Sequence, residues 1–146
     1  MKPQELLANW IEGATHGDRQ VDARGVHLTV AEIMTAHSRG KLDYGGTEFA
    51  PASSHSIMPL TSGPAEKYGW WRLDEGCYMV RFNERLKVGA PPSIVVADQH
   101  LAHCNCTLTP AIVTEGEIRS TLIVSPAGAS IKQFAQIALL WPLADV

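Results

Sequence analysis

Residues 73–84, with the sequence LDEGCYMVRFNE, decide the fold class of this chain. The stretch alternates two sets of side chains, Tyr78, Val80 and Phe82 in one and Met79, Arg81 and Asn83 in the other. A period of two residues is typical of a strand with one buried face. Apolar runs at 94–97 and 121–124, each next to turn residues, indicate further short strands. Together these patterns predict a mainly β protein, either a sandwich or a barrel.

The N-terminal part mixes helical and extended patterns. Apolar residues recur at helical spacing within residues 6–11, and alternation over 26–30 indicates a short strand. Thr29 and Glu32 have the spacing of a capping box. We therefore predict one helix near the N-terminus and a second over residues 30–38.

Two other segments have less regular patterns. Residues 41–69 are rich in Gly, Pro, Ser and Thr, which predicts a long irregular crossing with short strands near 48–49 and 57–60. Residues 130–140 fit a helical face and a strand equally well, so their periodicity leaves both structures open.

Composition excludes several classes of protein. The chain has 146 residues, enough for one domain, and 45% of them are hydrophobic, which supports a normal core. The net charge of −3 and the lack of a basic run argue against a nucleic-acid polymer as partner. No run is long and apolar enough to span a membrane. The N-terminus also lacks the apolar stretch of a secretory signal, so we do not expect one there. The three cysteines, Cys77, Cys104 and Cys106, are too few for a disulfide scaffold, so we expect a cytoplasmic protein.

Three stretches resemble motifs of one family. Residues 25–33 (GVHLTVAEI) are similar to an early "Gly-Val-Asp-Leu" strand, and residues 73–84 to a "Leu-x-Pro-Gly-x-Tyr-x-Val" strand followed by "Asn-Glu". Residues 130–137 (SIKQFAQI) are similar to a closing "Arg-Ile-Ala-Gln" strand. In this order and spacing, the chain resembles the dUTPase and dCTP-deaminase superfamily, and most of all its archaeal-type dUTPases. The likeness spans most of residues 20–143.

The resemblance implies a specific architecture. It implies a distorted β-barrel (β-clip) with one or two short N-terminal helices, in a single domain over 1–146. The N-terminal helix and turn would occupy 1–20 and the barrel 21–143, with 130–140 ending in a strand. It also implies a homotrimer with nucleotide sites between subunits, a deoxynucleotide as ligand, and Mg²⁺ if a triphosphate is bound.

The family's triphosphate cradle, "Arg-Ser-Ser-Leu", has a different sequence here. The matching stretch is Asp98-Gln99-His100-Leu101, which places an anion where the family has a cation. His27 likewise stands where the early motif has an acid. Gln136 keeps the family's residue, and Arg119 matches a family Arg. The residues expected to face a nucleotide are Gln136, Arg119, Gln99 and His100.

The family's hydrolytic residues are also replaced. Val113 stands where the family has the Asp that activates water, and an aliphatic side chain cannot accept a proton. Glu115-Gly116 stands in place of a "Gly-Tyr" that screens the deoxyribose. We therefore expect a non-catalytic or repurposed homologue that binds a nucleotide or a protein partner. The alternative is a divergent dUTP or dCTP pyrophosphatase or deaminase, in which Glu115 or Glu117 takes the place of the missing Asp.

A cluster of possible metal ligands follows the altered cradle. His100, His103, Cys104 and Cys106 are close in sequence, and the resemblance suggests a short helix over 98–104. Histidine and cysteine are common zinc ligands, but this spacing matches no common zinc module. A metal-binding protein is thus a second alternative. In the other interpretation of this cluster, the two thiols are small buried side chains and the two histidines are polar residues without a metal.

Adjacent tryptophans precede the deciding stretch. Trp70 and Trp71 follow Gly69, and neighbouring residues on a strand point to opposite faces. We expect one of the two to enter the core and the other to cover a surface or a subunit contact, and we favour packing over a role in stacking on a base.

Overall fold

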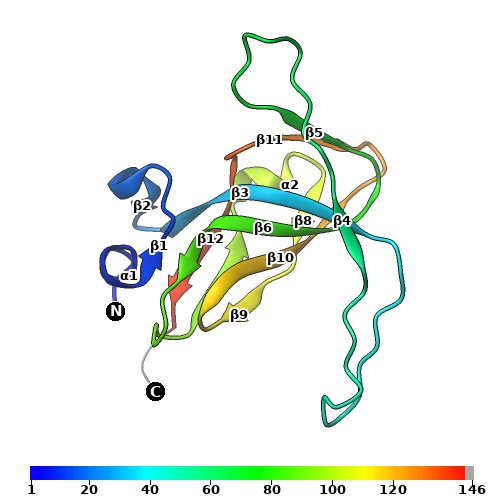
Figure 1. The fold of residues 1–146 in the computed structure, drawn as a ribbon. Helices are drawn as coiled ribbons and strands as arrows, with labels where there is room; N and C mark the ends of the chain where they lie inside the picture. The colour runs from blue at the N-terminus through cyan, green and yellow to red at the C-terminus, as the bar shows by residue number, and fades with distance from the viewer. Residues whose placement is uncertain (144–146) are drawn as a thin grey trace.

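The computed structural model describes residues 1–143 and is mainly β (Figure 1). The elements follow in the order α1 (Pro3–Trp10), β1 (Ile11–Glu12), the 3₁₀ helix η1 (Gly17–Gln20), β2 (Val21–Asp22), β3 (Gly25–Ala36), β4 (Ser54–Ser56), β5 (Trp70–Leu73), β6 (Gly76–Leu86), β7 (Ser93–Ala97), α2 (Gln99–Ala102), β8 (Cys106–Leu108), β9 (Ala111–Val113), β10 (Gly116–Val124), β11 (Ala129–Lys132) and β12 (Gln136–Pro142). Within residues 1–143, no helix is long and apolar enough to cross a membrane.

One large sheet dominates the structure. Its strands run in the order β8-β10-β6-β3-β12-β7-β9. In addition, β1 pairs with β6, β2 and β4 pair with β3, and β5 pairs separately with β11. The sheet curls around the core (Figure 1). This arrangement confirms the prediction of a barrel-like, mainly β fold with a short N-terminal helix.

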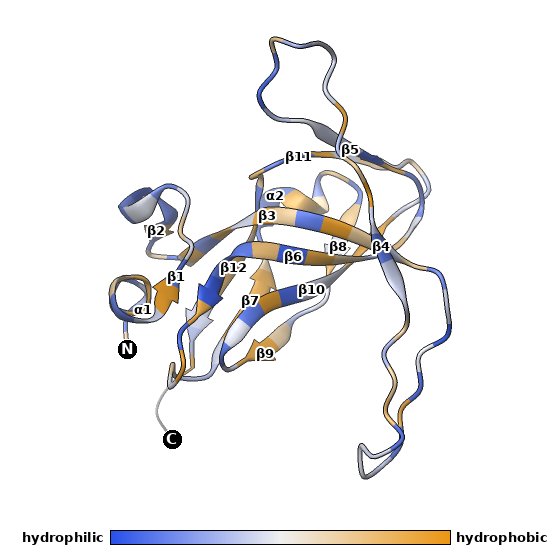
Figure 2. Ribbon diagram, viewed as in Figure 1, coloured by the Kyte–Doolittle hydropathy of each residue, from blue (hydrophilic) through white to orange (hydrophobic). Residues whose placement is uncertain are grey.

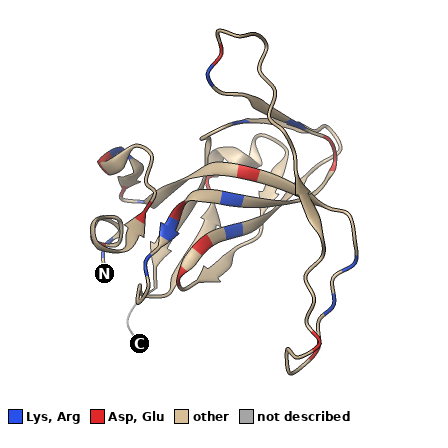
Figure 3. Ribbon diagram, in the orientation of Figure 1, with Lys and Arg blue, Asp and Glu red and all other residues tan. Residues whose placement is uncertain are grey.

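The deciding stretch forms the central strand β6. Val80, Phe82 and Leu86 point into the core, whereas Arg81 and Arg85 alternate with them on the outer side. The same alternation of apolar and polar residues is visible along β6 and β10 (Figure 2). Charged residues of both signs follow each other across β3, β6 and β10 on the outer side of the sheet (Figure 3).

Glu84 is the exception to this pattern, because it lies on the inner face of β6 and is fully buried. Its carboxylate accepts hydrogen bonds from the Thr29 backbone N–H (2.7 Å), the Thr29 hydroxyl (2.7 Å) and the Gln20 amide (2.9 Å). Next to it, the Asn83 amide donates to the Thr29 hydroxyl at 3.0 Å. These contacts join the two stretches of the sequence that identify the fold, on β3 and β6.

The second predicted helix, over residues 30–38, is wrong. Those residues belong to β3, one strand from Gly25 to Ala36, which pairs with β12 and β6. The register shifts between Val30 and Glu32, where a β-bulge interrupts the alternation and mimics helical spacing. Glu32 does not cap a helix but forms an ion pair with Arg81 at 3.1 Å.

The long crossing is irregular, as predicted, but its short strands lie elsewhere. Strand β4 covers Ser54–Ser56 and pairs with the end of β3. Isolated bridges join Lys41 to Ala50 and Leu60 to Trp70. The segments around these bridges extend away from the barrel (Figure 1). Residues 54–56 are extended because they pair with β3. Their sequence, SHS, has no alternation of apolar residues that would predict a strand.

The predicted helix near the N-terminus and the predicted extended structure near the C-terminus are both confirmed. Helix α1 buries Leu6 and Leu7 and begins with Pro3, which suits the first turn of a helix. The segment 130–140 is extended, as the resemblance implies, but it forms two strands, β11 and β12. A turn separates them, in which Phe134 has a positive φ of 66°.

Candidate functional site

A cavity of about 210 Å³ lies where β5, β11, α2 and the start of β12 meet. Its lining includes Trp70, His100, Leu101, Lys132, Gln136 and Ile137. Two of the predicted nucleotide-facing residues, His100 and Gln136, are therefore brought together. Gln99 lies beside His100 on α2 but is not among the lining residues.

Arg119 lies at a different place. It lines a second cavity of about 270 Å³, with Ala52, Tyr78 and Met79, between the outer side of β6 and β10 and the segment before β4. Its guanidinium donates two hydrogen bonds to Glu117, at 2.9 and 3.1 Å. Within one subunit, Arg119 thus does not join Gln136 and His100.

Backbone pairing holds His100 and Gln136 next to each other. Asp98 follows β7, and its backbone N–H donates to the carbonyl of Ile137 in β12 at 2.9 Å. This bond fixes the start of α2 against the start of β12. The observed helix, Gln99–Ala102, confirms the short helix expected within 98–104.

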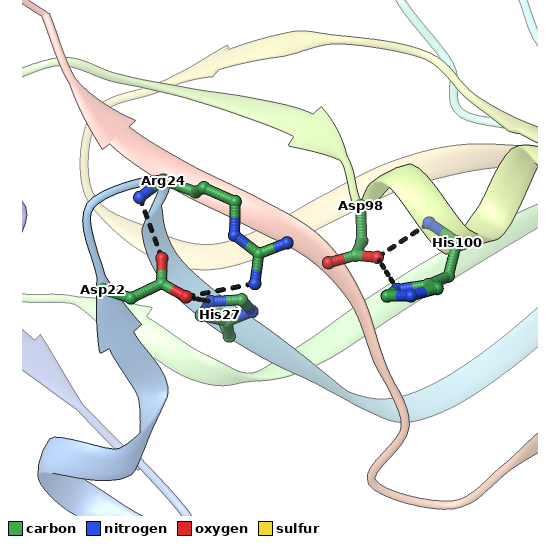
Figure 4. A network of polar contacts seen from close by, with 5 residues as sticks. All are labelled: Asp22, Arg24, His27, Asp98 and His100. Atoms are coloured by element: carbon green, nitrogen blue, oxygen red, sulfur yellow. Dashed lines mark hydrogen bonds and ion pairs between the residues drawn. The ribbon is translucent and has the colours of Figure 1, made fainter.

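Asp98 caps α2 with its own carboxylate. The Asp98 Oδ1 atom accepts the backbone N–H of His100 at 2.9 Å and lies 2.9 Å from His100 Nδ1 (Figure 4). Burial raises the pKa of Asp98, but the hydrogen bonds from the backbone and ring of His100, with the charges of His100 and Arg24, hold that pKa below its ordinary value. A buried negative charge therefore occupies the N-terminus of this helix.

This cap predicts a pH-dependent contribution to stability. Replacing Asp98 by alanine should lower the free energy of unfolding by about 1 kcal/mol near neutral pH, since that is a typical value for an N-cap. Because the folded-state pKa of Asp98 lies below the unfolded value of about 3.9, the contribution is complete above that value. It is lost as the pH falls through the folded-state pKa.

Urea denaturation of wild type and Asp98→Ala at neutral and acid pH measures this difference. Glu48→Ala, which removes an exposed acid outside the sheet, is the control and should leave stability unchanged at both pH values. An equal loss for Asp98→Ala at both pH values would contradict the capping role of the carboxylate.

His27, which replaces the family's acid, lies in a second polar network. Asp22 Oδ2 lies 2.8 Å from His27 Nε2 and 3.1 Å from Arg24 Nη2, and Asp22 Oδ1 accepts the Arg24 backbone N–H at 2.8 Å (Figure 4). The hydrogen bond from the Arg24 side chain, followed by those from its backbone and from His27, holds the pKa of Asp22 far below its ordinary value. Asp22 is therefore an ion-paired carboxylate and a weak base.

The two candidate acids lie outside the first cavity. Glu115 accepts a hydrogen bond from the Gly89 backbone N–H at 3.4 Å, and Glu117 pairs with Arg119 and, at 3.4 Å, with Arg85. The hydrogen bond from Arg119 is the main cause that lowers the pKa of Glu117. Val113 ends β9 and packs against the core. Within one subunit, neither Glu115 nor Glu117 lies beside Gln136.

The predicted metal ligands are not assembled into a metal centre. His100 and Cys104 line the cavity, but Cys106 begins β8 and is buried, and its thiol donates to the Cys104 carbonyl at 3.3 Å. Burial raises the pKa of the Cys106 thiol, which disfavours the thiolate that binds metals. Across residues 1–143, no three His, Cys, Asp or Glu side chains converge on one point.

Two cavity residues were not predicted from the sequence. The Lys132 Nζ atom lies 5.5 Å from the centre of the Trp70 ring, and both side chains line the cavity. These residues are paired in the β5–β11 ladder. Lys132 lies within the closing motif 130–137, but only the pairing of β11 with β5 shows which aromatic residue it faces.

Comparisons with known proteins agree with this fold. The chain is 31% identical over 135 residues to a probable deoxyuridine 5'-triphosphate nucleotidohydrolase of Methanosarcina mazei. The aligned region covers 89% of this chain and 75% of that protein. It is 28% identical over 135 residues to a protein of the same description from Methanosarcina acetivorans, with the same shares covered. No family model matches the chain. The sequence identity, extending over most of both chains, shows that this protein belongs to the deoxyuridine 5'-triphosphate nucleotidohydrolase (dUTPase) family.

Proposed function

We propose that this protein is a homotrimeric member of the dUTPase family that binds a nucleotide-class ligand without hydrolysing dUTP. The observation that carries the proposal is the Asp98 carboxylate at the N-terminus of α2. By the resemblance, residues 98–101 correspond to the family's triphosphate cradle.

The electrostatics of this position disfavour a triphosphate. Backbone N–H groups at a helix start can hold phosphate oxygens. Here Asp98 accepts the His100 N–H, and its buried charge would lie against the incoming polyanion. Two like charges 4 Å apart repel by about 1 kcal/mol in water and about 4 kcal/mol near a protein surface. Changing a cation to an anion therefore reverses the sign of the interaction.

The residues expected to supply the base of dUTP hydrolysis do not lie in this cavity. Val113 packs against the core and cannot accept a proton. Glu117 is held as an anion by two arginines, and neither Glu115 nor Glu117 lines the cavity that contains Gln136. A general base must lie within hydrogen-bond reach of the water that it activates.

The cavity itself supports a binding role. His100 and Gln136 bring hydrogen-bonding groups to a mostly apolar wall, and Trp70 adds an aromatic face. Sites of this kind bind small organic ligands. The trimer is supported by exposed apolar side chains on the sheet, such as Ile112 on β9 and Ile123 on β10.

Incubation of the purified protein with dUTP or dCTP and Mg²⁺ tests the proposal. We expect neither pyrophosphate nor ammonia above the rate without protein. Melting temperatures measured with deoxyuridine and dUMP should rise, because a ligand that binds the folded state stabilises it. Size-exclusion chromatography with light scattering tests the trimer.

Glu115→Ala and Glu117→Ala separate the proposal from the alternative that kinship with probable dUTPases favours. If the wild type turns over dUTP or dCTP and either variant abolishes that turnover, the protein is a divergent enzyme and the proposal is wrong. Glu75→Ala is the matched control, because Glu75 is an exposed acid in the turn between β5 and β6.

A further inference from the structure

We infer that the cavity formed by β5, β11, α2 and β12 binds an uncharged nucleoside through its base, in preference to a nucleoside triphosphate. This inference rests on the proposed function and names the ligand class of the same site. It follows from the size of the cavity, its aromatic face, its hydrogen-bonding groups and its charge.

The cavity suits a compact ligand. Its volume of about 210 Å³ is below the roughly 300–1,000 Å³ of ordinary small-molecule sites. Much of its wall is aliphatic, with Leu101, Ile131 and Ile137 among the lining residues. Such a wall favours a ring over an extended polyphosphate.

Trp70 provides a fixed surface for stacking. Trp70 is 38% exposed, so part of its ring is open to a ligand beside the Lys132 ammonium group. Two hydrogen bonds join the preceding residue, Gly69, to Gln133. The Gly69 N–H donates to Gln133 Oε1 at 2.7 Å, and the Gln133 N–H donates to the Gly69 carbonyl at 3.0 Å. Every nucleobase has a flat face that can stack on such a ring.

The polar groups complement the edge of a base. Because Asp98 is held ionised, the His100 Nδ1 atom carries the proton that it shares with Asp98 Oδ1 at 2.9 Å. In the neutral ring this leaves Nε2 as an acceptor, which suits the ring N–H of a pyrimidine-dione. The Gln136 amide adds one donor group and one acceptor, as the neighbouring carbonyl and N–H groups of a base require.

The charge of the cavity does not match a triphosphate. Its lining contains one Lys or Arg side chain, Lys132, whose charge already lies over the Trp70 ring. Behind His100 lies the buried negative charge of Asp98. A ligand with several phosphates would therefore meet one cation in the lining, with the Asp98 carboxylate and its neighbour Arg24 behind it, whereas an uncharged nucleoside needs no charged partner.

Isothermal titration calorimetry of the protein with deoxyuridine, dUMP and dUTP, without Mg²⁺, tests this inference. We expect deoxyuridine to bind the wild type more tightly than dUTP does. Trp70→Ala should weaken deoxyuridine binding at least about fivefold, since loss of one stacked base typically has such an effect. Lys132→Ala should change it less than about threefold.

Trp141→Ala is the matched control. Trp141 lies at the far end of β12 with a similar exposure of 39%, and it is not among the residues that line the cavity. It should leave the affinity for deoxyuridine unchanged.

Each remaining outcome contradicts the inference. Tighter binding of dUTP than of deoxyuridine, lost in Lys132→Ala, would show a phosphate-directed site, and without turnover the proposed function would still stand. Absence of binding by deoxyuridine, or equal losses in Trp70→Ala and Trp141→Ala, would show that the cavity is not a nucleoside site. Pyrophosphate release from dUTP with Mg²⁺, measured separately, contradicts the proposed function instead.

Discussion

Replacing Glu84 by alanine is expected to lower the free energy of unfolding by about 3–5 kcal/mol. The Glu84 carboxylate is fully buried and accepts three hydrogen bonds, two from Thr29 and one from Gln20. Truncation leaves the Thr29 N–H buried without an acceptor and removes one acceptor each from the Thr29 hydroxyl and the Gln20 amide. A buried donor left without its acceptor has a large desolvation cost. Urea denaturation of the wild type and the variant measures the difference.

Two further variants make this test specific. Glu84→Gln keeps one acceptor oxygen but turns an amide toward a donor, so its loss should lie between those of wild type and Glu84→Ala. Glu75→Ala removes an exposed acid and should change stability by less than about 0.5 kcal/mol. A loss below about 1 kcal/mol for Glu84→Ala would contradict the role assigned to these hydrogen bonds.

Replacing Trp71 by alanine is expected to lower the free energy of unfolding by about 3–5 kcal/mol, the usual range for a buried tryptophan. The side chain is 2% exposed, and its indole N–H donates to the Ile57 carbonyl at 2.8 Å. The variant creates a cavity in the core and leaves that carbonyl without its partner. The long crossing between β3 and β5 should therefore loosen as well, which hydrogen exchange at Ile57 and nearby amides would detect.

The adjacent Trp70 is the natural control for Trp71. It has the same chemistry and neighbours Trp71 on β5, but it faces the cavity and is 38% exposed. Trp70→Ala should cost about 0.5–1 kcal/mol, mainly the contact with Lys132. Similar losses in the two variants would contradict the assignment of one tryptophan to the core and the other to the cavity.

The sequence predicts much of the fold because local patterns and burial agree there. Alternation over 78–82 identifies β6, and helical spacing over 6–11 identifies α1. The expectation that Trp70 and Trp71 face opposite ways is confirmed for the same reason, since side chains alternate along a strand.

Long-range pairing explains what the sequence does not predict. The bulge at residues 30–32 gives β3 a helical spacing, and only its pairing with β6 and β12 keeps it extended. Glu84 looks like part of a solvated polar run until β3 brings Thr29 against it. The cavity has the same origin, because Lys132 meets Trp70 through the β5–β11 ladder and His100 meets Gln136 through the bond between Asp98 and Ile137.

The contacts that hold the fold and the residues of the candidate site lie in different parts of the molecule. The contacts around Glu84 and Thr29 are buried, and neither residue lines the cavity. Asp98 and His100 lie at the start of a short helix that follows β7. A fold can be kept while a site built on it changes.

The central claim is that the dUTPase-family barrel is kept here while its triphosphate site is lost, and the rate of pyrophosphate release from dUTP with Mg²⁺ tests it most directly. We predict that pyrophosphate is released at the same rate with and without the protein. Turnover in the ordinary enzymatic range of roughly 1–10³ s⁻¹ would contradict it.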